Sequence, residues 1–366
     1  MPVLVPFLSQ FGLTLQEIFV LQAVFSLLII TGEVPTGMFA DRFGRKPSLI
    51  IGILLSMTGL FVFIQGGNFW VFLLGESIMG VGSSFASGAH QALLYESLDE
   101  IGESRTYTQE SGRMHSISNV SEGLAALAAT GIATISLVAT LWAGFFAKFA
   151  ALAILFFMVE PKREIHAGPQ LAQLRRVLTY IRRKRTLVYF IAFVVIASVA
   201  TRTGAWLYQP LFVEMNIGIE LFGLLWAATL FVAAAASWFA HRVDTLIGRR
   251  SGLILVLLTG TFGFLLVGAL PTLWGLGAII LIQVCRGFTG PFLEDEIHKL
   301  VPSDRRATVF SVKNMLHNLT FAAVIVGVGG IAEQSIFIAF MAVGVGLALL
   351  GTGTLLVLLR KTVIYK

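Results

Sequence analysis

Three sets of polar residues lie inside long apolar stretches, where a charged side chain is costly and marks a pathway or a partner. The members of each set recur at steps of three or four residues, so each set shares one face of a helix. The sets are Glu76, Gly80, Ser83, Ser87 and His90, then Ser198, Arg202, Trp206 and Gln209, and finally Gln283, Arg286 or Gly287, Gly290 and Glu294. The spacing predicts three polar helix faces, each of which is expected to face a cavity or a partner.

Each ionisable member of these faces has an expected role. Glu76 is expected to exchange protons, with His90 as a helper because imidazole titrates near neutral pH. Gln91, next to His90, belongs to the same expected cavity, and Arg202 and Arg286 are expected to set which charges the cavity accepts. Structural ion pairing is the alternative for the charged residues, and helix packing is the alternative for the serines.

The elements that position these faces are membrane-spanning helices. Hydrophobic residues make up 56% of the chain, charged residues only 13%, and glycine occurs 37 times, as expected where helices pack closely in lipid. Apolar stretches of about 18 residues or more recur along the whole length. We therefore expect an all-α membrane protein with eleven spans, at residues 15–40, 48–64, 70–95, 114–136, 139–159, 187–211, 221–243, 251–270, 273–297, 308–332 and 335–359.

The turn between the first two of these spans concentrates charge and glycine in residues 37–46. Its notable members are Gly37, Asp41, Arg42, Gly44, Arg45 and Lys46. We expect Gly37 to let its helix approach a neighbour closely, Asp41 to pair with a base or a helix N-terminus, and Pro47 to suit the first turn of the next helix. Such a charged turn belongs at a membrane face.

The distribution of bases and an internal repeat give orientation and domain organisation. With the Asp41 turn placed inside, the loop lysines and arginines all fall on the cytoplasmic side, so the net charge of +6 indicates topology and not nucleic-acid binding. Residues 237–250 are a longer, degraded copy of the turn, with His241 in the place of Asp41. We expect helix bundles at 1–160 and 187–366, joined by a basic linker at 161–186 that contains an interfacial helix.

The turn at residues 37–46 resembles, position for position, the loop signature of the major facilitator superfamily between its second and third transmembrane helices. The half-repeat, the central basic loop and the stretch at residues 87–98 extend the resemblance over essentially the full chain. The resemblance implies two pseudo-symmetric bundles with twelve helices, of which the first is mostly absent at the start of this chain. It also implies that the Gly37, Asp41, Arg42, Gly44, Arg45 and Lys46 set latches a cytoplasmic gate.

Counting that first helix makes the three polar faces helices four, seven and ten, which line the central cavity of the superfamily. The expected function is secondary active transport of a small molecule by alternating access, with proton-coupled export as the first choice. The alternatives are proton-coupled uptake of an anionic metabolite and a non-transporting sensor on the same scaffold. Glu76 stands where many members carry arginine, and the fifth helix lacks the Gly-Pro signature of drug/proton antiporters, so multidrug antiport is not implied.

Enzymatic activity is not expected from this sequence. It contains no His-Glu-x-x-His motif, no phosphate-binding glycine loop with its lysine, and no Gly-x-Ser-x-Gly elbow. The histidines are scattered, and a single cysteine, Cys285, cannot form an intrachain disulfide. The expected partners are a small-molecule substrate, protons and the bilayer of a cell (inner) membrane that a multi-pass monomer crosses. We expect no cofactor, metal ion or nucleic acid.

Overall fold

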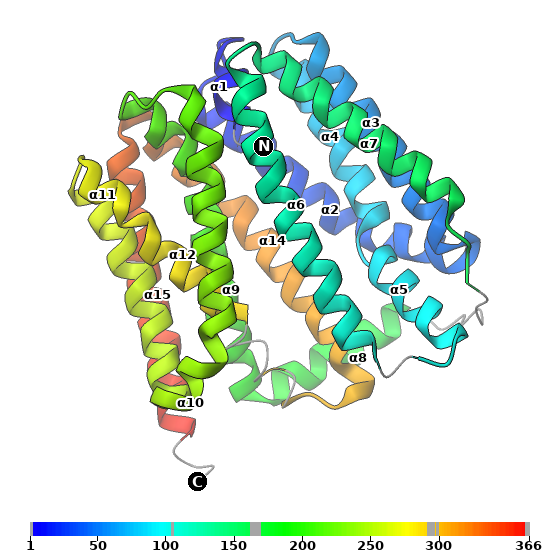
Figure 1. Cartoon of the computed structure of the whole chain (residues 1–366). Coiled ribbons are helices and arrows are strands. Elements are labelled where there is room, and N and C mark those ends of the chain that lie inside the picture. The colour runs from blue at the N-terminus through cyan, green and yellow to red at the C-terminus, as the bar shows by residue number, and fades with distance from the viewer. Residues whose placement is uncertain (1–2, 104–105, 162–169, 291–296, 298–299, 363–366) are drawn as a thin grey trace. The chain divides into compact units, whose positions relative to one another are not determined.

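The computed structural model describes residues 3–103, 106–161, 170–290, 297 and 300–362 (Figure 1). These residues form helices and no strand, which confirms the all-α prediction. The helices are α1 (Leu4–Ser9), α2 (Leu15–Phe43), α3 (Arg45–Gln65), α4 (Phe69–Ala86), α5 (Ala89–Glu100), α6 (Tyr107–Ala133), α7 (Leu137–Phe157), α8 (Gln170–Arg183), α9 (Arg185–Glu214), η2 (Ile219–Leu221), α10 (Phe222–Ala269), α11 (Leu273–Gly277), α12 (Ile279–Thr289), α14 (Ser303–Gln334) and α15 (Ile336–Thr362).

Most of the predicted spans appear as helices that are long and apolar enough to cross a membrane. The described residues contain 9 such helices. The predicted spans at 114–136 and 273–297 correspond instead to the shorter apolar helices Val120–Ala133 and Leu273–Thr289. The fold is therefore that of a polytopic membrane protein.

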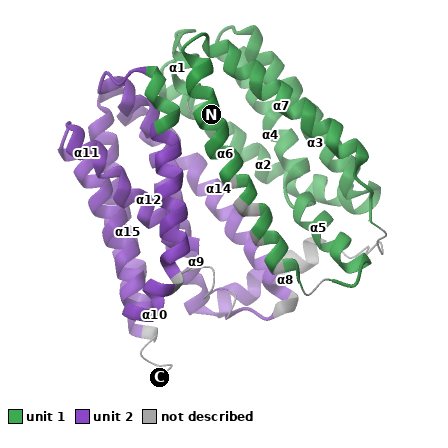
Figure 2. Ribbon diagram, in the orientation of Figure 1, with its two compact units in different colours: residues 1–168, 219–224 green, residues 169–218, 225–366 purple. Residues whose placement is uncertain are grey.

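The chain divides into two compact units (Figure 2). Unit 1 comprises residues 1–168 and 219–224, and unit 2 comprises residues 169–218 and 225–366. The expected linker at 161–186 is thus shared between them, with α8 in unit 2, where Val177 and Ile181 of α8 are buried. The position of α8 at the membrane interface stays a prediction.

Glycines allow the helices of unit 1 to pack closely. A Cβ atom at Gly52 would lie 2.8 Å from the carbonyl oxygen of Gly82, and one at Gly59 would lie 2.5 Å from that of Gly75. Both pairs join α3 to α4. Any side chain at these positions would force the two helices apart, which explains part of the high glycine content.

The contact between α2 and α4 corrects one expectation. We expected Gly37 to bring its helix close to a neighbour, but no described atom lies within 4 Å of a Cβ built there. The close approach is at Gly32, five residues earlier, where an added Cβ would collide with the side chain of Ser84. The glycine of the charged turn that has a conformational role is Gly44.

The predicted continuous span at 70–95 is interrupted between α4 and α5. Ser87 and Gly88 separate the two helices, and Gly88 has the left-handed φ of 75°. The carbonyl groups left without helical partners are held by hydroxyls of other helices, since Thr36 donates to Ser84 O at 2.9 Å and Ser48 donates to Phe85 O at 2.7 Å. The helix break in unit 1 therefore leaves these two carbonyl groups with hydrogen-bond partners.

Unit 2 is organised around α9. This helix is buried along most of its length and packs against α12, α14 and α15. The long α10 changes direction at Gly248, whose φ of 77° and ψ of 159° are not helical. Gly248 belongs to the second copy of the charged turn, so both copies place a positive-φ glycine where one helix gives way to the next.

Candidate transport sites

The charged turn of unit 1 depends on the conformation of Gly44. This residue joins α2 to α3 with a φ of 122°, a region that side chains disfavour. A Cβ atom there would also lie 2.8 Å from Glu160 Oε1 and 3.0 Å from Pro47 Cδ. Glycine is required at this position for both reasons, and Pro47 lies in the first turn of α3 as expected.

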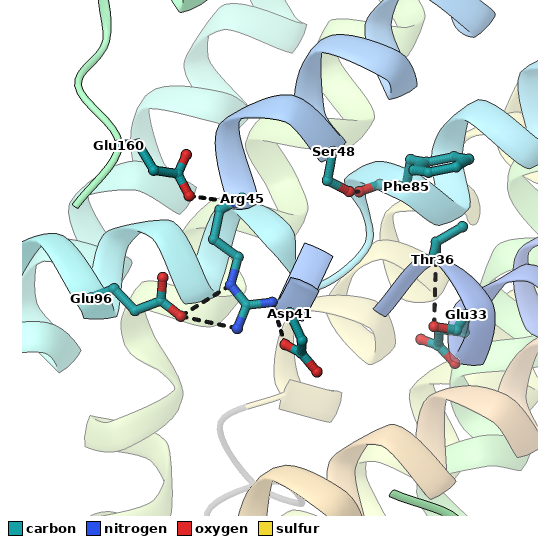
Figure 3. Close-up of polar contacts among 8 residues, drawn as sticks. All are labelled: Glu33, Thr36, Asp41, Arg45, Ser48, Phe85, Glu96 and Glu160. Atoms are coloured by element: carbon teal, nitrogen blue, oxygen red, sulfur yellow. Dashed lines mark hydrogen bonds and ion pairs between the residues drawn. The ribbon is translucent and has the colours of Figure 1, made fainter. Parts of the chain in front are cut away.

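Arg45 bridges two acids across the turn (Figure 3). Its Nη1 lies 2.7 Å from Asp41 Oδ1, and its Nη2 lies 2.9 Å from Glu96 Oε1. Its Nε donates to the same Glu96 oxygen at 3.0 Å. The guanidinium group therefore ties the end of α2 and the start of α3 to α5, with the planar geometry that arginine provides and lysine does not.

Glu160 caps the N-terminus of α3 from a distant part of the chain. Its two carboxylate oxygens accept hydrogen bonds from the backbone N–H groups of Arg45 and Lys46, each at 2.7 Å. A negative charge at a helix N-terminus satisfies free donors and favours the helix dipole. Lys46 completes the link, since its Nζ donates to Phe156 O at 2.8 Å near the end of α7.

Four members of the predicted gate set are thus joined in one network, namely Asp41, Gly44, Arg45 and Lys46. Arg42 is exposed, with its guanidinium carbon 5.2 Å from the centroid of the Phe43 ring. Neither Glu96 nor Glu160 was predicted to belong to this network. Glu160 is followed by Pro161 and ends an apolar run, which is the signal that could have indicated a capping acid.

The second copy of the turn has an ion pair of its own. Arg249 Nη2 lies 3.1 Å from Asp244 Oδ2, on either side of the Gly248 kink. The acid therefore stands three residues after His241, the residue in the place of Asp41 in this copy of the turn. The insertion that makes this copy longer carries the acid, so the pairing survives while the spacing changes.

Glu76 forms a buried pair with a residue that the sequence analysis missed. Gln22 Nε2 on α2 donates to Glu76 Oε1 on α4 at 2.9 Å, and each residue is only 4% exposed. Among the residues that the structure describes, no cation forms an ion pair with Glu76. Gln22 is a lone amide in an apolar run, so the rule that selected Glu76 could have found it too.

The remaining members of the first polar face separate at the helix break. Ser83 is half-buried on α4, whereas Ser87 lies in the break, where its hydroxyl donates to Glu33 Oε1 at 3.3 Å. His90 and Gln91 are exposed in the first turn of α5. The structure thus divides the predicted single stripe between two helices.

A polar cluster in unit 2 surrounds Arg202. The Arg202 Nη1 donates to Asn318 Oδ1 at 2.7 Å and lies 3.3 Å from His317 Nε2. The guanidinium carbon is 3.9 Å from the centroid of the Phe321 ring, which is cation–π geometry. His317 Nδ1 lies 2.9 Å from the hydroxyl of Ser198. The α14 residues of this cluster were not predicted, although His317 and Asn318 are adjacent polar residues in an apolar span.

Gln283, another predicted residue of unit 2, has its described hydrogen bond outside this cluster. Gln283 is buried on α12, where its Nε2 donates to Tyr208 Oη at 3.1 Å and its Oε1 has no hydrogen-bond partner among the described residues. Gln209 is buried and Trp206 is half-buried on α9, and Arg286 is exposed. Glu294 lies outside the described residues.

Comparisons with known proteins agree with this architecture. The family model of the Major Facilitator Superfamily matches residues 1–325. An uncharacterized transporter of Buchnera aphidicola subsp. Schizaphis graminum (strain Sg) is 30% identical over 94 residues, which is 24% of this chain and 24% of that protein. The chain thus aligns with about a quarter of the length of this relative.

Two solved structures share the fold. A point mutant of the nucleoside transporter NupG superposes with a TM-score of 0.75 at 12% identity, covering 96% of this chain and 92% of the other. A second NupG structure gives a TM-score of 0.73 at 13% identity and covers 96% and 91%. At this level of identity the similarity concerns the fold alone.

Proposed function

Because the chain belongs to the Major Facilitator Superfamily, we propose that it is a secondary active transporter that moves a small molecule by alternating access and couples this movement to protons. The observation that carries the proposal is the buried Glu76 with its single described hydrogen-bond partner, Gln22. An ionisable side chain in the interior of a membrane span marks a transport pathway or a proton relay.

The Gln22 amide suits a carboxyl group that gains and loses a proton. An amide carries donors on its nitrogen and an acceptor on its oxygen, so it can donate to the carboxylate and, after rotation, accept from the protonated acid. Both states of Glu76 then keep a hydrogen bond, and no buried charge partner has to move away. This supports Glu76 as the proton-binding group, with the exposed His90 of α5 as the proposed helper.

The network around Arg45 is proposed to latch the cytoplasmic gate. It links α2, α3 and α5 through the Arg45 side chain and fastens the end of α7 through Glu160 and Lys46. These side chains are partly exposed, so the ion pairs are weak enough to open and close during a transport cycle. The network would hold the ends of these helices in one conformation and release them in another.

Export in exchange for protons is the direction that we propose first. Glu76 can hold a proton or interact with a solute, and competition between the two at one carboxyl group is the simplest form of antiport. A second candidate is proton-coupled uptake of an anion, which the Arg202 cluster of unit 2 favours. A cation in an apolar span is a natural partner for a negatively charged solute.

Flux through proteoliposomes tests this proposal. A thermal-shift screen first selects a transported solute, because a ligand that binds the folded state raises its apparent stability. A pH gradient of each sign is then imposed, and solute accumulation reports the direction. We expect Glu76→Gln to abolish pH-driven flux while Glu122→Gln, at an exposed glutamate of the same unit, retains it. Unchanged flux in the Glu76 variant would refute the assignment, and a solute that binds without flux would favour a sensor.

A further inference from the structure

The imidazole ring of His317 is held at both of its nitrogen atoms. Nδ1 lies 2.9 Å from Ser198 Oγ, and Nε2 lies 3.3 Å from Arg202 Nη1. Both partners belong to α9, whereas His317 belongs to α14. The ring therefore bridges two packed helices of unit 2, next to Arg202 in the interior of α9.

The donors around the ring fix its protonation state. A guanidinium group has N–H donors and no acceptor, so His317 Nε2 must receive the hydrogen bond from Arg202 and cannot carry a hydrogen itself. The ring is then neutral, with its hydrogen on Nδ1, which donates to Ser198 Oγ. The Ser198 hydroxyl is free to donate onward to Val195 O at 3.2 Å, so every donor in this series meets an acceptor.

A second proton on His317 is incompatible with this arrangement. It would place an N–H on Nε2 against the N–H of Arg202, with two positive charges in contact. The conflict disappears if an anion takes the place of Nε2 as the acceptor for Arg202, since the protonated ring can then donate to the same anion. Proton binding at His317 and anion binding at Arg202 therefore favour each other.

The charges around His317 strengthen this linkage. On α14 the nearest is Lys313, one turn earlier, and α9 contributes Arg202. The α15 helix has no ionisable residue between Ile336 and Leu359. Lys184, which precedes α9, donates to the Leu300 carbonyl oxygen. The two charged groups that the described part of unit 2 brings closest to the ring, Arg202 and Lys313, are positive, so an anion would be stabilised there.

We propose that Ser198, Arg202 and His317 form a site for a carboxylate anion, in which His317 takes up one proton when the anion binds. The proton comes from water and is placed on Nε2, and the anion accepts hydrogen bonds from both Arg202 and the imidazolium. The inference rests on the second candidate function, proton-coupled anion uptake, in one respect only, which is that the bound anion is the cargo. It would make carboxylate and proton move in the same direction.

The first test addresses the ring itself. Histidine-selective ¹⁵N labelling of the protein in lipid nanodiscs gives nitrogen signals, and the set that vanishes in His317→Gln belongs to His317. We expect the neutral form with hydrogen on Nδ1 at pH 7.5. A neutral ring with hydrogen on Nε2, or a doubly protonated ring without added anion, would overturn the proposal.

The second test addresses the linkage. Benzoate is the carboxylate probe, because its planar carboxylate matches a guanidinium group and its ring suits the aromatic ring of Phe321, which lies against Arg202. Benzamide is its neutral counterpart. Titration calorimetry of the wild-type protein in buffers with different ionisation enthalpies measures proton uptake. We expect benzoate, and not benzamide, to bind with uptake of up to one proton, and we expect this uptake to fall at high pH, where the ring stays neutral even in the complex.

Variants separate the roles of the two side chains. Arg202→Gln should weaken benzoate binding by about tenfold or more, the range of a lost hydrogen bond to a charged group. His317→Gln should still bind benzoate but without proton uptake, and Asn314→Ala, at an exposed residue of the same helix, should behave like the wild type. Absence of benzoate binding to the wild type, binding without proton uptake, or uptake that persists in His317→Gln would overturn the site. Failure of liposome flux alone would refute the transport proposal and leave this binding result intact.

Discussion

The Glu160 carboxylate accepts the backbone N–H of Arg45 at 2.7 Å, although the two residues are 115 positions apart in the chain. Glu160 follows the end of α7, and Arg45 is the first residue of α3. The N-terminus of a helix early in unit 1 is thus capped by the residue that follows the unit's last long apolar helix. This contact and the Arg45 side chain together make the turn a junction of α2, α3, α5 and α7.

Removal of the cap should destabilise unit 1. Glu160→Ala leaves the N–H groups of Arg45 and Lys46 without their acceptors, and the loss of an N-cap costs about 0.5 to 2 kcal/mol. We expect a lower midpoint of thermal unfolding in detergent, measured by tryptophan fluorescence. Glu103→Ala, at an exposed acid between α5 and α6, serves as the control. Equal midpoints for the two variants would show that the cap contributes nothing.

Substitution of Gly44 should be far more harmful than that of Gly37. Gly44→Ala must adopt a φ of 122° and also meets Glu160, which together cost about 1 to 3 kcal/mol. Gly37→Ala should be neutral or slightly stabilising, because its surroundings are open and alanine favours the helix. Thermal unfolding of the two variants measures the difference. A destabilised Gly37→Ala protein would contradict the observed packing.

The two ion pairs of Arg45 should differ in strength. Glu96 receives two hydrogen bonds from the guanidinium group and its side chain is 20% exposed, whereas Asp41 receives one and is 36% exposed. Double-mutant cycles with Arg45→Gln, Glu96→Gln and Asp41→Asn should give a larger coupling energy for the Glu96 pair, within the range of about 0.5 to 3 kcal/mol for residues in contact. The opposite order would mean that solvent exposure does not determine the relative strength of these two ion pairs.

Loss of the Gln22 amide should affect both stability and coupling. Gln22→Met keeps the volume but leaves the buried Glu76 carboxyl group without its hydrogen bond, at a cost of about 1 to 3 kcal/mol. We expect reduced pH-driven flux and a lower unfolding midpoint, while Gln65→Met, at an exposed residue of α3, changes neither. Normal flux with reduced stability would indicate that Gln22 is purely structural.

The sequence predicted those features that depend on nearby residues. Long apolar runs must form helices in a membrane because each backbone polar group needs a partner within the segment, so the existence and approximate position of most spans followed from the residues alone. Asp41 and Arg45 are only four residues apart, on either side of Gly44, so the pairing of Asp41 with a base was also accessible to sequence reasoning. Gly44 and Pro47 were also predictable from local preferences. Gly44 forms the turn between α2 and α3, and Pro47 lies in the first turn of α3.

Contacts between residues of different helices could not be predicted from local sequence patterns. Periodicity places Glu76 on a face of α4 but does not say that Gln22 lies opposite, and it places Arg202 on α9 without indicating His317. The break at Ser87 and Gly88 was also missed, because glycine is frequent in apolar runs and its φ is decided by packing. Hydroxyls of Thr36 and Ser48, from two other helices, are what make that break possible.

The interruption at Ser87 and Gly88 separates α5 from α4, so that only two residues outside the helices join them. Glu96 lies on α5 and the buried Glu76 lies on α4, so the two carboxyl groups belong to different helical segments. We expect that the segment with Glu96 can change its direction relative to the segment with Glu76, since only two residues join them.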